Sequence, residues 1–65
     1  MNKYVAIPVP NSNQYRACTI GPCGDFHILS CRDFDTWTEA DQVARDLATG
    51  KYPNIAPSGE YVNMR

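Results

Sequence analysis

Residues 15–32 read YRACTI GPCGD FHILSCR, and this stretch decides the fold. Two strand-like runs, Tyr15–Ile20 and Phe26–Arg32, flank the five residues Gly21–Asp25. Glycine, proline and aspartate occupy tight turns because they tolerate positive backbone φ angles or preset the turn geometry. The stretch therefore predicts a β-hairpin.

The sequence predicts the hairpin but does not determine which residues of its two strands pair. If Ile20 lies opposite Asp25, Cys18 faces His27. A register shifted by one residue exchanges these partners and moves each side chain relative to its neighbours. Both registers remain open at the level of sequence.

Upstream of the hairpin, residues 4–9 alternate between two faces, as a strand does. Val5, Ile7 and Val9 form the apolar face. We expect Tyr4 to point outward, because it precedes Val5. Pro8 lacks a backbone N–H, so an interior position would cost a hydrogen bond, and we expect an edge strand.

Downstream, Thr36-Trp37-Thr38-Glu39 fits a helix-capping box, and apolar residues then follow helical spacing to Leu47. Gly50 is placed just beyond the helix end, and Pro53 prevents the helix from resuming. We expect Trp37 to be the main core anchor on the sheet. The opposite face of the helix carries Glu39, Asp41, Gln42, Arg45 and Asp46.

These segments predict an α+β fold: a small three-stranded antiparallel sheet packed on one C-terminal amphipathic helix. Residues 1–50 form the single hairpin and helix domain in this interpretation, and residues 51–65 follow as an extended tail. The tail contains Pro53, Pro57 and Gly59, and Glu60–Met64 could add a short fourth strand.

Composition narrows the class of function. A 65-residue chain has a small core and little room for a substrate cleft, so we expect no enzyme activity. The chain has six Lys and Arg and seven Asp and Glu, so it lacks the basic excess that nonspecific nucleic-acid binding needs. Pro8 and Pro10 interrupt the first apolar run before it could form a signal or membrane segment, so we expect a cytoplasmic protein without a membrane partner.

The cysteines admit two interpretations. Cys18, Cys23, His27 and Cys31 have a ligand order similar to the zinc knuckle of nucleic-acid-binding proteins. In a continuous strand, however, Cys31 would lie about 13 Å beyond His27, too far to share one ion. We therefore expect structural cysteines and no cofactor, with zinc as the alternative.

An acidic chain with little core and an available edge strand suits a small protein-interaction module. We expect an accessory or inhibitory protein, of the kind that phages and mobile elements encode against a host nucleoprotein machine. Its partner would be a larger protein or nucleoprotein complex, and the edge strand could also form a homodimer. The expected partner-binding residues are Tyr4, Asp33, Asp35, Asp41, Arg45, Asp46, Tyr52 and Tyr61.

A nucleic-acid-binding module is the alternative function. The order of three strands and a helix resembles the arm-binding domains of tyrosine recombinases and the AP2-like DNA-binding modules. The resemblance spans Tyr15–Leu47 and rests on Phe34-Asp35-Thr36, followed by Glu39-Ala40 and Ala44. It implies that the sheet reads DNA, although those families carry more basic residues on the sheet than this chain does.

Overall fold

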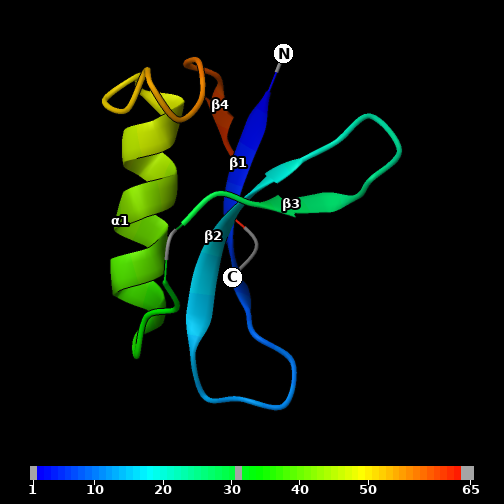
Figure 1. Cartoon of the computed structure of the whole chain (residues 1–65), viewed down its shortest axis with the longest axis vertical. Coiled ribbons are helices and arrows are strands. Elements are labelled where there is room, and N and C mark those ends of the chain that lie inside the picture. The colour runs from blue at the N-terminus through cyan, green and yellow to red at the C-terminus, as the bar shows by residue number, and fades with distance from the viewer. Residues whose placement is uncertain (1, 31, 64–65) are drawn as a thin grey trace.

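A computed structural model of the chain describes residues 2–30 and 32–63. Its elements are β1 (Lys3–Pro8), β2 (Tyr15–Ile20), β3 (Phe26–Ile28), α1 (Trp37–Ala48) and β4 (Glu60–Tyr61) (Figure 1). The strands form one sheet in the order β3-β2-β1-β4, in which β1 and β4 run parallel and the other pairs are antiparallel. The predicted α+β class is confirmed, and the sheet is a mixed one of four strands.

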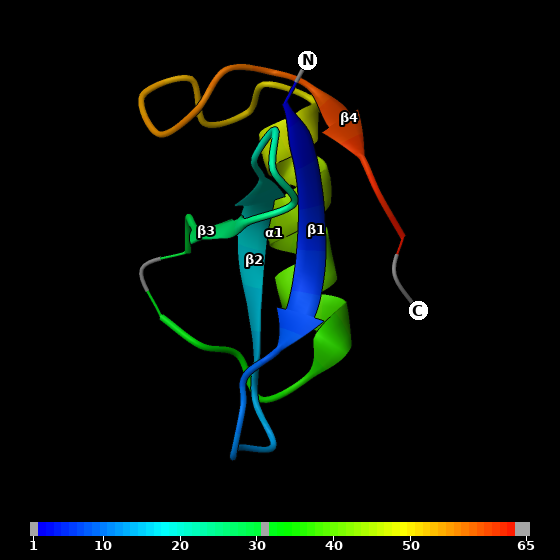
Figure 2. The ribbon, with the colours of Figure 1, turned by 90° about the vertical axis from the view of Figure 1, so that its right-hand side faces the viewer.

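The helix covers one face of the sheet, as Figure 2 shows with β1 and β2 in front of α1. The core between them consists of Tyr4, Ala17, Ala44, Leu47 and Ala48. Three of these residues are alanines, so the helix packs close to the strands with small side chains. Val5 and Cys18 are paired on the opposite face and are also fully buried.

The first strand is central in the sheet, so the prediction of an edge strand is wrong. β1 pairs with β2 on one side and with β4 on the other, because the tail folds back beside it. The backbone N–H of Val62 donates to Tyr4 O at 2.8 Å. Pro8 is tolerated because it ends β1, beyond the residues that pair with β4.

The outward orientation predicted for Tyr4 is also wrong. Tyr4 is fully buried on the helix-facing side of the sheet, and its hydroxyl donates to the carbonyl oxygen of Pro57. It is the largest fully buried side chain among the described residues. Trp37 is only half-buried, so Tyr4 has the anchoring role that we expected of Trp37.

The helix has its predicted bounds. Thr36 is the N-cap, and its hydroxyl oxygen accepts from the Glu39 N–H at 3.3 Å. The second bond of the capping box differs from the prediction, because the Thr36 hydroxyl itself donates to Glu39 Oε1 at 3.1 Å. Gly50 follows the C-cap with φ +83°, a conformation that favours glycine. In the described residues, no helix is both long and apolar enough to cross a bilayer.

The hairpin is confirmed, and its register is the shifted one. Ile20 lies opposite Phe26 rather than Asp25, which places Cys18 opposite Ile28. β3 is shorter than the predicted strand because the chain bulges after Ile28. Two successive backbone N–H groups, of residues 29 and 30, donate to the single carbonyl of Ala17, which is the pattern of a β-bulge.

Residues 52–62 are packed on the rest of the fold. Tyr52, Ala56 and Tyr61 contact the core cluster, and the N–H of Gly59 donates to Ala48 O at 2.9 Å. The segment therefore covers one end of α1 before it enters the sheet as β4. The fourth strand that the sequence allowed is present, and it pairs with β1 in parallel.

Candidate protein-binding edge

The hairpin of β2 and β3 projects away from the helix as an arm (Figure 1). All three residues of β3 are exposed, and the relative exposure is 46% for Phe26 and 56% for Ile28. Phe26 and Ile28 lie opposite Ile20 and Cys18, so their side chains share the sheet face that α1 does not cover. The arm thus presents two large apolar side chains to solvent on one face.

The backbone of the same two residues points to the open edge of the sheet. Hydrogen-bonded and non-bonded pairs alternate along an antiparallel ladder. Backbone bonds join Gly21 to Asp25 and Ala17 to Leu29, so His27 is the β3 residue that bonds to β2. The N–H and C=O groups of Phe26 and Ile28 therefore point outward, where no strand of the described residues follows β3.

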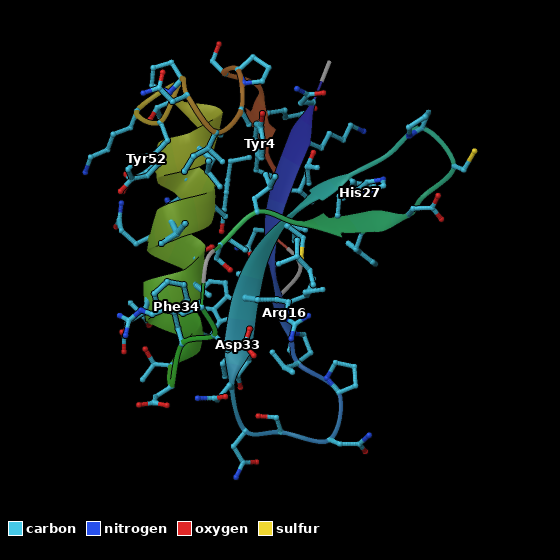
Figure 3. The ribbon with its side chains drawn as sticks, in the orientation of Figure 1. Tyr4, Arg16, His27, Asp33, Phe34 and Tyr52 are labelled. Carbon is cyan, nitrogen blue, oxygen red and sulfur yellow. The ribbon has the colours of Figure 1, made fainter. Side chains whose placement is uncertain are left out.

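His27 lies on the other face of the arm, opposite Thr19 (Figure 3). A Cβ at Gly21 would come within 3.1 Å of His27 Nε2, so the imidazole lies directly over this glycine. Beside it is an open depression of about 670 Å³, which Lys3, Thr19 and His27 help to line. The described lining contains no carboxylate, so its ionisable groups are one lysine and one histidine.

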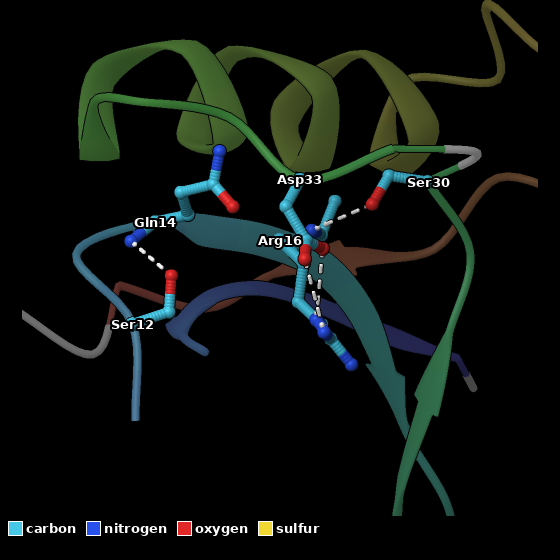
Figure 4. Close-up of polar contacts among 6 residues, drawn as sticks. Ser12, Gln14, Arg16, Ser30 and Asp33 are labelled. Carbon is cyan, nitrogen blue, oxygen red and sulfur yellow. Dashed lines mark hydrogen bonds and ion pairs between the residues drawn. The ribbon is translucent and has the colours of Figure 1, made fainter. Parts of the chain in front are cut away.

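The base of the arm is held by polar contacts along β2 (Figure 4). Arg16 forms a two-bond ion pair with Asp33, with Nε to Oδ1 at 3.1 Å and the second guanidinium nitrogen to Oδ2 at 3.2 Å. The Ser30 hydroxyl accepts from the Ala17 N–H at 3.3 Å. Planar two-bond pairs of this kind fix relative orientation, so the loop after β3 is tied to β2 at two points.

The predicted binding residue Asp41 is buried, with a relative exposure of 6%. Its carboxylate accepts from the Tyr61 hydroxyl and from Arg45 Nε at 2.8 Å. Burial, and then the hydrogen bond to Asp41, raise the pKa of Tyr61. The same carboxylate raises the pKa of Arg45 through a hydrogen bond and its charge. These three predicted site residues therefore form a cluster that joins α1 to β4.

The other predicted acids also have partners within the chain. Asp46 accepts from Gln42 at 3.0 Å and lies 3.4 Å from Lys51 Nζ, and Asp35 accepts from Gln14 at 3.1 Å. Asp33 pairs with Arg16. Tyr52 packs on the core, with Lys51 over its ring. The predicted residues surround α1 and its termini and do not converge on one free acidic patch.

The residues proposed as zinc ligands are separated. The side chain of Cys18 is buried on the face of the sheet away from α1, whereas His27 lies on the opposite face, so the two do not converge on one ion. Cys23 is exposed in the turn, and Cys31 lies outside the described residues. Burial raises the pKa of the Cys18 thiol, which disfavours the thiolate that zinc requires.

Sequence reasoning did not single out Phe26 and Ile28, the two exposed large apolar residues of β3. The alternation Phe26-His27-Ile28 after a glycine-rich turn was a usable signal, but we assigned the open edge to the first strand instead. Comparison with protein-family models, with curated proteins and with solved structures found no match.

Proposed function

We propose that the chain is a protein-interaction module that binds an extended, apolar segment of a partner protein along the open edge of β3. One observation carries this proposal: Phe26 and Ile28 combine exposed apolar side chains with outward-pointing backbone groups. Strand addition uses both features, because backbone hydrogen bonds align the added strand and side-chain contacts supply the affinity and selectivity.

The charge of this face supports an apolar partner. Lys3 pairs in register with Glu60 on the sheet face away from α1, and Arg16 on the same face is paired with Asp33. These opposite charges balance, so neither a polyanion nor a strongly cationic segment is favoured there. The aromatic ring of Phe26 suits a contact centre, since aromatic residues are enriched in interface cores.

In this proposal the edge of β3 takes the place of the first strand and of the acidic helix face, which were the expected binding surfaces. The first strand is not an edge, and Asp41 and Asp46 are already bonded within the chain. An accessory or inhibitory role and a nucleoprotein target, both expected from size and charge, stay predictions. The nucleic-acid alternative has weaker support, because the arm from Ile20 to Ile28 contains no lysine or arginine.

Two isoleucines with the same exposure provide a matched test. Ile28 and Ile55 each have a relative exposure of 56%, but Ile55 lies in the loop after α1, away from the arm. A photoreactive residue at position 27 should first identify the partner by crosslinking in cells. Calorimetry with the purified partner should then show binding at least about tenfold weaker for Ile28→Asp and unchanged for Ile55→Asp.

Two results of the calorimetry would contradict binding at the β3 edge. If Ile28→Asp binds the purified partner as tightly as wild type does, or if Ile55→Asp weakens binding equally, the β3 edge is not the binding site. Circular dichroism of both variants should match that of wild type, because neither isoleucine belongs to the buried core.

A further inference from the structure

The open edge of β3 is complementary to itself. When two copies of β3 meet antiparallel around a two-fold axis at His27, Phe26 of one copy lies opposite Ile28 of the other. The outward N–H and C=O groups of each facing pair can then exchange two hydrogen bonds. The side chains of Phe26 and Ile28 also meet on one face, which makes an apolar cross-strand pair on each side of the axis.

We propose that a second copy of this chain pairs at the β3 edge, and that this homodimer competes with the partner protein for the edge. The inference rests on the proposed function, because it assigns a form of regulation to the same site. A homodimer through an edge strand was expected from the sequence, but there the first strand was the edge. β3 takes that place because its outer side is open.

Charge does not oppose this pairing. Asp25 is the one permanently charged residue from Ile20 to Ile28, and the two-fold register places it opposite Leu29 of the second copy. The helix α1, which carries three of the seven acids, lies on the other side of the sheet from Phe26 and Ile28 (Figure 2). Across the seam, His27 faces its own counterpart at a non-bonded position, where Cα atoms are about 4.5 Å apart.

The small area of the seam points to a weak dimer. Three residues from each copy bury on the order of a few hundred Å², well below the roughly 1,200 Å² of stable specific interfaces. We therefore expect a dissociation constant on the order of 0.1–1 mM. Such a dimer forms where the chain is concentrated and yields to a partner that covers more of the arm.

The symmetric position of His27 permits a charge-exchange experiment on the full chain under reducing conditions. Sedimentation should show that His27→Lys and His27→Glu each self-associate at least about tenfold more weakly than wild type, because like charges then face each other. An equimolar mixture of the two variants should restore a dimer. Asn54→Lys and Asn54→Glu change an exposed position outside the arm. Each should self-associate as tightly as wild type, alone and in an equimolar mixture.

Several results would overturn the inference. These are a wild-type chain that stays monomeric at about 1 mM, a His27 mixture that does not restore association, and association that persists unchanged in Ile28→Asp. None of these results contradicts the proposed function, which is tested separately by the affinity of Ile28→Asp for the purified partner. Conversely, restored dimers together with normal partner binding by Ile28→Asp would retain the homodimer and remove the heterologous partner from this edge.

Discussion

Tyr61 donates its hydroxyl hydrogen to the buried carboxylate of Asp41 and thereby joins β4 to α1. Arg45 completes the cluster, with its guanidinium 4.5 Å from the centre of the Tyr61 ring. A buried carboxylate needs such partners, because an unsatisfied charge in a protein interior costs several kcal/mol. The C-terminal strand is thus held by a polar contact on the helix side as well as by backbone bonds to β1.

Removal of the Tyr61 hydroxyl should destabilise the whole fold. Tyr61→Phe keeps the ring but leaves Asp41 with one hydrogen-bond donor fewer, and we expect a loss of about 1–3 kcal/mol in the free energy of unfolding. Urea denaturation followed by circular dichroism measures this loss. Tyr52→Phe is the control, since Tyr52 also packs on the core but is not one of the donors to Asp41. Equal stabilities of the two variants would contradict the role of the cluster.

The stability of the protein should fall in alkaline solution. Folding raises the pKa of Cys18 above 9.0 and that of Tyr61 above 10.0, mainly because burial disfavours the anions. The folded state therefore holds these protons more strongly than the unfolded state does. This contribution is complete below pH 9 and is lost as the pH rises through the folded pKa values.

Urea titrations from pH 7 to 11 would measure this loss. Cys18→Ala should flatten the first part of the profile, above pH 9, and Tyr61→Phe should flatten the later part. A wild-type profile that is level up to pH 11 would contradict the prediction.

Gly59 allows the C-terminal strand to approach β1. A Cβ at this position would clash with the carbonyl oxygen of Asn2 and would come within 2.9 Å of Tyr4 Cε2. Gly59→Ala should therefore displace β4 and cost about 1–3 kcal/mol through overpacking. Gly24→Ala is the comparison, because a Cβ there meets nothing within 4 Å and the cost is only that of φ +84°. Thermal denaturation should show a lower midpoint for Gly59→Ala than for Gly24→Ala.

The predictable parts of the fold are those with local signals. The turn Gly21–Asp25 identified the hairpin, and the capping box with Gly50 identified both ends of α1. Each of these signals involves residues close together in the chain, so a single sequence contains them. The register of the hairpin stayed open at the level of sequence, because the turn allowed either pairing.

The unpredicted parts depend on contacts between distant residues. The position of β1 in the sheet depends on β4, whose Tyr61 pairs with Tyr4 across the length of the chain. Both faces of β1 are buried, so its alternation did not distinguish an inside from an outside. The error at Tyr4 followed from this, and so did the assignment of the open edge to β1 instead of β3. The acidic residues were expected to be free because the sequence does not reveal which cations fold against them.

The two described cysteines should differ strongly in their reaction with iodoacetamide. Cys23 is exposed in the hairpin turn, whereas Cys18 is fully buried and its thiol pKa is raised by that burial. Only the thiolate reacts, so Cys18 is protected both by its packing and by its protonation.

Two single-cysteine proteins with the other cysteines replaced by serine isolate each thiol. At pH 7.5 we expect alkylation of Cys18 to be at least about 100-fold slower than that of Cys23, because it requires the sheet to open. Urea above the unfolding midpoint should remove the difference, and equal rates without urea would mean that the β1–β2 pair opens freely in the native protein.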